Sequence, residues 1–276
     1  MNKLNTLFLL AFLLLTFQRS DAQSCCARPV GMQAMALTAS FKAAHEPPAP
    51  LAYEAKKGAM MSFPVTGGAE GHAFYVPGTS NKVLIIFHEW WGLNDYIKRE
   101  AEEWQNRLGE EVSVYAIDLY DGQVATAPDE ASKMMSALTP ERGKAIIAGL
   151  LKVIGGGKRI ATLGWCMGGS WSFTGAVLAG PSAVGCVMYY GFPEKDMARI
   201  KPLKCDVLYI RGSKDDFIKQ EDVAQFEKKV QSTGHNITMY SYEAVHAFAN
   251  PSNPKYDKKS AADAQGKALA FLKQKL

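Results

Sequence analysis

The chain has 276 residues, of which 47% are hydrophobic and 21% are charged, and its formal net charge is +4. This is the composition of an ordinary globular protein, and the length is sufficient for one sizeable hydrophobic core. No basic stretch is interleaved with aromatic residues, so nucleic acid is not expected as a partner.

The first 22 residues have the features of an export signal. Lys3 is followed by an apolar run over residues 7–17, and the small residues Ser20 and Ala22 precede the predicted cleavage point. The apolar run is shorter than the ~20 residues needed to span a bilayer. We therefore expect cleavage near Ala22, a periplasmic or secreted protein, and no transmembrane segment in the mature chain.

Residues 23–54 are rich in proline and alanine and show no sustained hydrophobic period. This pattern predicts an extension or tether ahead of a domain that covers residues 55–276. Cys25 and Cys26 stand near the beginning of the extension. The sequence leaves open whether one of them carries a lipid anchor after cleavage or whether they form disulfide bonds.

The next segments predict an antiparallel hairpin and then an α/β architecture. Residues 60–65 and 71–77 flank a Gly-rich turn, and residues 82–87 form a continuous apolar run typical of a strand buried on both faces. Further strands are predicted at residues 112–117, 158–163, 207–210 and 237–243, and helices at residues 95–108, 130–138, 140–154, 170–178 and 260–275. Such alternation indicates a parallel sheet, whose ligands bind at the carboxyl ends of the strands.

The segment 164–170 combines a thiol with the glycine spacing of a nucleophile elbow. Gly164 and Gly168 stand two residues before and two residues after Cys166, between a predicted strand and a predicted helix. Glycines at these positions remove side chains that would clash in a tight turn. A structural cysteine in a glycine-rich loop is the alternative, and partners elsewhere in the chain must decide between the two.

An acid and a histidine follow Cys166 in the order that an α/β-hydrolase requires. Asp215 lies in a loop after the strand at 207–210, and His246 follows the strand at 237–243. The other histidines are weaker candidates for the catalytic base because of their places in the chain. They are His45 in the proline-rich extension, His72 in the hairpin, His88 directly before Glu89, and His235 at a helix end.

Five motifs in this order make residues 55–276 resemble the dienelactone hydrolase family of α/β-hydrolases. They are residues 87–92, residues 116–120, the Cys166 elbow, residues 212–217 and residues 246–249. The resemblance implies an α/β-hydrolase fold, with a mostly parallel central sheet flanked by helices and an N-terminal antiparallel hairpin. It places a triad on Cys166, Asp215 and His246, with Asp216 as a one-residue alternative for the acid.

The resemblance also implies a reaction, hydrolysis of a small carboxylic ester or lactone through an acyl-enzyme. The backbone N–H groups of Met167 and Trp90 would hold the oxyanion. Glu89 would touch the resting, protonated thiol until substrate displaces it. Further substrate contacts are expected from Trp91, Tyr120, Gly122, Trp165, Phe248 and Asn250. No cofactor and no metal are expected, and the oligomeric state is left open.

Two positions differ from the relatives that open dienelactones. Those relatives carry arginines that clamp a substrate carboxylate, where this chain has Asp121-Gly122 and Asn250. Without a guanidinium group, bidentate recognition of a carboxylate is lost at these positions. The sequence therefore favours uncharged substrates. Acyl transfer, thioester cleavage and a non-catalytic binding role on the same fold remain as alternatives.

Overall fold

The structure is a computed structural model that describes residues 32–276. The predicted export signal and the Cys25-Cys26 pair lie outside the described residues. Within residues 32–276, no helix has both the length and the apolar character needed to cross a membrane.

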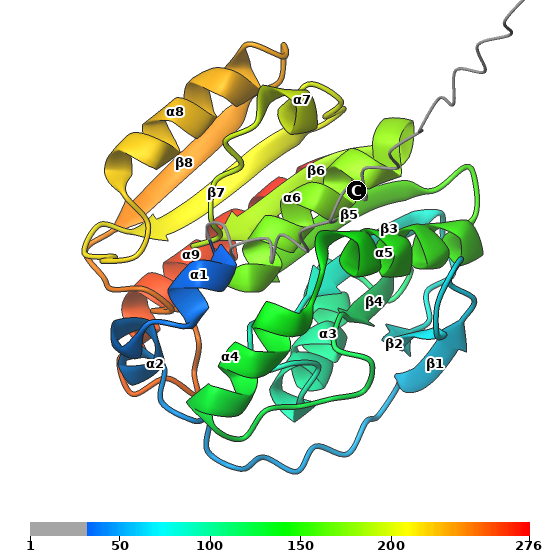
Figure 1. The fold of residues 1–276 in the computed structure, drawn as a ribbon. Helices are drawn as coiled ribbons and strands as arrows, with labels where there is room; N and C mark the ends of the chain where they lie inside the picture. The colour runs from blue at the N-terminus through cyan, green and yellow to red at the C-terminus, as the bar shows by residue number, and fades with distance from the viewer. Residues whose placement is uncertain (1–31) are drawn as a thin grey trace, which may run out of the picture.

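An eight-stranded sheet forms the centre of the molecule (Figure 1) and has the order β1-β2-β4-β3-β5-β6-β7-β8. The strands are β1 (Ala59–Phe63), β2 (Gly71–Val76), β3 (Lys82–Phe87), β4 (Ser113–Asp118), β5 (Arg159–Trp165), β6 (Ala183–Tyr189), β7 (Asp206–Gly212) and β8 (Ile237–Tyr242). β2 pairs antiparallel with both β1 and β4, and the remaining neighbours are parallel. The predicted mostly parallel sheet with an N-terminal antiparallel hairpin is confirmed.

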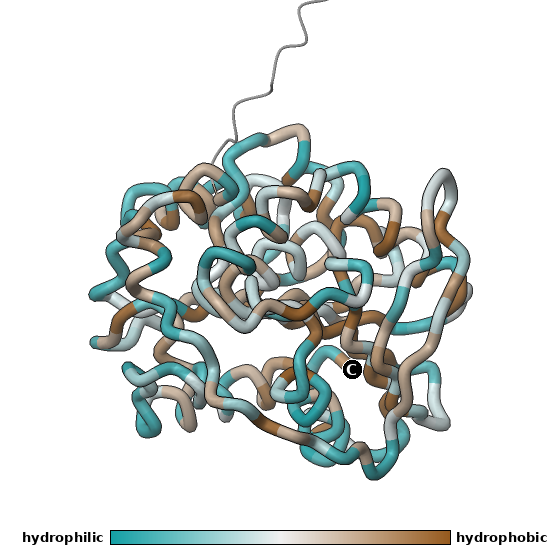
Figure 2. The backbone as a smooth tube through the Cα atoms, turned by 60° about the horizontal axis from the view of Figure 1, so that its bottom comes forward, coloured by the Kyte–Doolittle hydropathy of each residue, from teal (hydrophilic) through white to brown (hydrophobic). Residues whose placement is uncertain are grey.

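Helices cover the sheet on both faces (Figure 1), and α3 packs against α9 while α5 packs against α6. They are α3 (Asp95–Leu108), α4 (Pro128–Ala137), α5 (Pro140–Ile154), α6 (Met167–Ala179), α7 (Met197–Ile200), α8 (Gln220–Gln231) and α9 (Lys258–Lys275). Hydrophobic segments run through the interior, and hydrophilic segments gather at the periphery (Figure 2). α6 begins at Met167, earlier than predicted, because the helix starts directly after the turn at Cys166.

The described part of the predicted extension packs against the domain. α1 (Met32–Ala36) and α2 (Ala39–Ala44) both contact α4. Ala36 and Phe41 are fully buried. The Phe41 ring lies 5.2 Å from Trp90 and 4.9 Å from Phe217, which come from two distant loops. We call residues 32–45 the cap segment; unlike the loosely packed extension expected from its composition, it is held against the domain by the buried side chains of Ala36, Phe41 and His45.

The cap segment offers a matched pair of variants. Phe41→Ala should lower the free energy of unfolding by about 3–5 kcal/mol, because it removes a buried aromatic ring and leaves a cavity. Leu37→Ala lies in the same segment, but Leu37 is 50% exposed, so the change should stay within roughly 0.5 kcal/mol. Denaturant unfolding monitored by fluorescence measures both. Equal stability of the two variants would show that the cap segment is not packed.

Candidate active site

Cys166 lies in a strained turn between β5 and α6. Its φ of 54° and ψ of −121° fall in a region that residues with a side chain seldom adopt. A Cβ atom on Gly164 would lie 2.1 Å from the carbonyl oxygen of Gly168, and one on Gly168 would lie 2.3 Å from that of Phe87. Both glycines are therefore required by close backbone contacts, as the elbow motif predicts.

Asp215, His246 and Cys166 form a continuous chain of polar contacts. His246 Nδ1 lies 2.7 Å from Asp215 Oδ2, and His246 Nε2 lies 3.2 Å from Cys166 Sγ. The other carboxylate oxygen of Asp215 accepts hydrogen bonds from the backbone N–H groups of Phe217 and Ile218, at 2.9 and 3.1 Å. The structure thus places Asp215, and not the exposed Asp216, against the histidine.

In this series of contacts, the charged forms of His246 and Asp215 stabilise each other. Burial opposes the charged form of His246, but the neighbouring Cys166 and Asp215 outweigh it and raise the pKa of His246 to about 10. Burial likewise opposes ionisation of Asp215, yet His246 and the two backbone N–H groups lower the pKa of this carboxyl below its ordinary value. This arrangement favours a protonated imidazole held between the Asp215 carboxylate and the Cys166 sulfur, and a neighbouring imidazolium is a group that activates a thiol.

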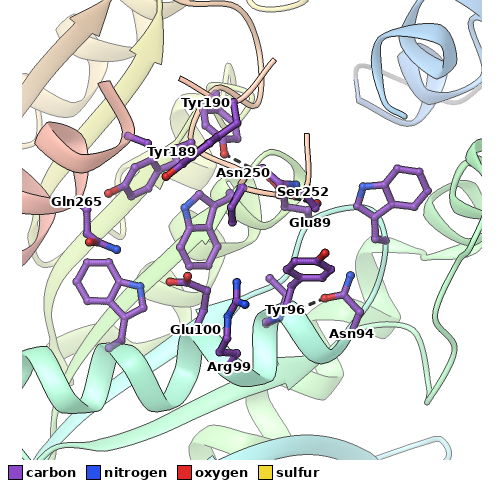
Figure 3. A pocket seen from close by; sticks show the side chains of 18 of the residues that line it. Glu89, Asn94, Tyr96, Arg99, Glu100, Tyr189, Tyr190, Asn250, Ser252 and Gln265 are labelled. Atoms are coloured by element: carbon purple, nitrogen blue, oxygen red, sulfur yellow. Dashed lines mark hydrogen bonds between the residues drawn. The ribbon is translucent and has the colours of Figure 1, made fainter. Parts of the chain in front are cut away.

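Glu89 lies near His246 and is held in place by two polar side chains (Figure 3). The Tyr190 hydroxyl donates to Glu89 Oε1 at 3.4 Å, and the Asn250 amide donates to Oε2. Burial raises the pKa of Glu89 to about 7, although His246, Tyr190 and Asn250 act in the opposite direction. No hydrogen bond joins Glu89 to Cys166 among residues 32–276, so the expected role of Glu89 at the resting thiol stays a prediction.

Three of the predicted substrate-contacting residues line one cavity. Trp91, Trp165 and Asn250 line a cavity of about 200 Å³. Glu89 lines it as well, beside Asn250 (Figure 3). Helix α3 forms part of its wall through Arg99 and Glu100. Because Trp165 directly precedes Cys166, this cavity adjoins the elbow.

The other three occupy different positions. Tyr120 is buried, and its hydroxyl donates to the sulfur of Met167 at 3.1 Å. Phe248 is fully buried against Tyr190, at a centroid distance of 5.7 Å, and belongs to the core. Gly122 lies in an exposed turn, where its N–H donates to Asp118 at 2.5 Å. None of these three residues lines the cavity beside Glu89, so the structure does not bring them to it.

The two predicted oxyanion donors come from adjacent loops. Met167 is the first residue of α6, and Trp90 follows β3. These loops touch, since the α-carbon of Gly168 abuts the backbone carbonyls of Phe87 and His88. In the described part of the chain, neither the Met167 nor the Trp90 N–H has a hydrogen-bond acceptor, so both are available to an oxyanion.

His45 is a residue of this site that the sequence did not indicate. Its ring stacks on Phe41 at 4.1 Å and meets the ring of His246 edge-on at 5.3 Å. Burial is the main reason that the pKa of His45 falls to about 3, so the ring is neutral. The cap segment thus covers the nucleophile, and Cys166 and His246 are only 1% and 6% exposed.

A family match covers most of the described residues. The model of the dienelactone hydrolase family matches residues 71–276. The chain therefore belongs to the dienelactone hydrolase family, a family of hydrolases.

Individual relatives extend over most of the chain. The "Protein usf" of Aquifex pyrophilus is 27% identical over 229 residues, which are 79% of this chain and 99% of the relative. "Carboxymethylenebutenolidase 1" of Cupriavidus pinatubonensis is 25% identical over 223 residues, covering 75% of this chain and 92% of its own. A solved dienelactone hydrolase-like promiscuous phosphotriesterase from metagenomic libraries has a TM-score of 0.68 at 18% identity and covers 80% of this chain and 99% of its own. The predicted α/β-hydrolase fold is confirmed.

The raised pKa of Glu89 predicts a pH-dependent stability. Below pH 4.5, the ordinary pKa of a glutamate, the Glu89 carboxyl is protonated in both the folded and the unfolded chain. Between pH 4.5 and about 7 the carboxyl ionises in the unfolded chain but stays protonated in the folded chain, so the free energy of unfolding falls as the pH rises. Glu89→Gln cannot ionise. Its free energy of unfolding relative to the parent should therefore rise between about pH 5 and pH 8, by at most on the order of 3 kcal/mol.

Denaturant unfolding at the two pH values measures this difference. Glu70→Gln, which changes an exposed glutamate in the hairpin turn, is the matched control and should show no such trend. A constant difference between Glu89→Gln and the parent would contradict the proposed burial of the Glu89 charge.

Proposed function

We propose that the protein hydrolyses small carboxylic esters or lactones with Cys166 as the nucleophile, His246 as the acid and base, and Asp215 as the group that orients the histidine. The observation that carries this proposal is the contact chain Asp215–His246–Cys166 at a strained strand-to-helix turn. Family membership supports the hydrolase class, and the geometry supports the assignment of roles.

The first half-reaction would acylate the sulfur. The Cys166 thiolate attacks the carbonyl carbon, a C–S bond forms, and the π electron pair moves to the carbonyl oxygen. The N–H groups of Met167 and Trp90 stabilise this oxyanion, each contributing about 2.7–4 kcal/mol by analogy with other oxyanion holes. The oxyanion then collapses, the C–O bond breaks, and the proton on His246 Nε2 passes to the departing alkoxide.

The second half-reaction would return the free enzyme. Neutral His246 takes a proton from water, and the resulting hydroxide attacks the thioester carbon. The C–S bond breaks, releasing a carboxylic acid and the Cys166 thiolate beside the imidazolium. Asp215, fixed by two backbone N–H groups, keeps the histidine in one tautomer through both steps.

The two positions without arginine support neutral substrates. The Asn250 amide is engaged by Glu89, and Gly122 lies in an exposed turn, so neither supplies a cation for a substrate carboxylate.

The predicted signal over residues 1–22 makes the proposed esterase an exported one, which fractionation of cells that produce the full chain would test.

Replacement of the sulfur tests the nucleophile. Cys166→Ala should lower kcat/KM on short aryl esters by on the order of 10⁴-fold or more, because no other group can form the acyl-enzyme. Cys205→Ala removes a buried thiol that directly precedes β7, whereas Asp215 follows that strand, and should keep the parent activity. Steady-state hydrolysis of p-nitrophenyl esters measures both. Parent-like turnover by Cys166→Ala would refute the assignment.

The acid is tested by two neighbouring variants. Asp215→Asn should lower kcat by on the order of 10⁴-fold, since an amide at this position favours the wrong histidine tautomer. Asp216→Asn changes an exposed carboxylate and should cost little. The two kcat values are compared on the same ester. A larger loss for Asp216→Asn would show that the acid is the next residue.

A further inference from the structure

Three side chains from distant parts of the chain bring metal-ligating atoms together. One ring nitrogen of His45, one of His246 and the sulfur of Cys166 all lie within 4.8 Å of one another. Thiolate sulfur and imidazole nitrogen are preferred ligands of Zn²⁺ in proteins. We propose that His45, Cys166 and His246 form a Zn²⁺ site. In this site the metal is bound to the Cys166 sulfur, the atom that would otherwise attack the substrate.

The state of His45 is the first argument. Its Nδ1 lies 2.7 Å from the carbonyl oxygen of Phe41, and a carbonyl only accepts, so Nδ1 carries the proton. Nε2 is left with a lone pair. The side chain is 5% exposed, and Nε2 has no hydrogen-bond partner within residues 32–276. Buried polar atoms without a partner are rare and call for an explanation, and a bound cation provides one.

The groups behind the two histidines are the second argument. A histidine that binds a metal almost always donates its other ring N–H to a carboxylate or a backbone carbonyl, which fixes the ring. His246 meets this condition through Asp215 at 2.7 Å, and His45 meets it through Phe41 at 2.7 Å. Both rings are thus already oriented as ligands.

The spacing of the ligand atoms is the third argument. Around a tetrahedral Zn²⁺ with bonds of about 2.0 Å to nitrogen and 2.3 Å to sulfur, ligand atoms lie roughly 3.3–3.7 Å apart. The His246 Nε2 to Cys166 Sγ distance is 3.2 Å, and no separation exceeds 4.8 Å. A movement of about 1 Å by the His45 ring would complete the site. Three protein ligands leave the fourth position to water, as in zinc sites with an open position.

Metal binding itself does not depend on the proposed function, because it needs only the three ligands. Its consequence does rest on the proposed function: a sulfur lone pair bound to Zn²⁺ cannot attack a carbonyl carbon. The cap segment would then do more than cover the nucleophile, since it carries the ligand that turns a cysteine–histidine pair into a metal site.

Titration of the metal alone tests the proposal. Metal-free protein carrying Cys25→Ser and Cys26→Ser, so that these thiols do not contribute, is titrated with Zn²⁺ in competition with a chromogenic chelator. We expect one tight site per chain. His45→Phe keeps a ring within the aromatic cluster but removes a ligand. It should weaken Zn²⁺ binding by more than the roughly 10–100-fold that is lost when a residue that hydrogen-bonds a metal ligand is replaced. Asp215→Asn, which changes such a group, should fall within that range. His72→Phe, in the β1–β2 hairpin, should bind as the parent does.

Two further measurements keep the test decisive if His45→Phe does not fold. Zn²⁺ should protect Cys166 of the parent from alkylation, as shown by peptide mapping, and Co²⁺ should give a thiolate charge-transfer band that Cys166→Ala lacks. Equal affinity of folded His45→Phe and parent, a site that survives Cys166→Ala, or binding of Cu⁺ but not Zn²⁺ would each overturn the proposal. A parent that binds Zn²⁺ at this site but hydrolyses no ester even when it is metal-free would refute the proposed function and leave the metal site standing.

Discussion

The candidate site depends on one tight turn, the passage from β5 into α6 at Cys166. Its positive φ exists because Gly164 and Gly168 let three backbone segments approach more closely than any Cβ atom would permit. The turn places the sulfur at the N-terminus of α6, whose partial positive charge favours an anion. It also brings the end of β3 and the residue that follows it against α6, because a Cβ atom on Gly168 would lie within 2.4 Å of the carbonyl oxygens of Phe87 and His88. The strain is therefore located where the chemistry is proposed to occur.

Around this turn, charge and burial act together. His246 bridges the sulfur and the fixed carboxylate of Asp215, so protonation of the ring is favoured even though the ring is buried. Glu89 lies close enough to His246 to respond to that charge, is held by Tyr190 and Asn250, and lines the cavity beside α3. Asn250 thus has a role that its position alone did not indicate: its amide donates a hydrogen bond to a carboxylate of the protein itself, that of Glu89.

The features that the sequence predicted are local or ordered along the chain. Strand and helix periodicity, the glycines around Cys166, and the order of Asp215 and His246 after it can all be recognised in short windows, and the structure agrees with each. The remaining features depend on tertiary contacts. His45 lies in a segment without periodicity and is buried only because Phe41 docks on Trp90 and Phe217. The hydrogen bond from the Tyr190 hydroxyl to Glu89 and the exposure of Gly122 likewise depend on how distant loops pack together.

The proposed catalysis requires Cys166 to form a covalent bond with the acyl group of the substrate. Rapid acid quenching after mixing with an activated aryl ester, followed by intact-mass and peptide analysis, measures this directly. We expect one acyl group per chain, located on the peptide that contains Cys166 and absent from Cys166→Ala. Turnover of the ester with no acyl group on that peptide, or with the group on another residue, would contradict it.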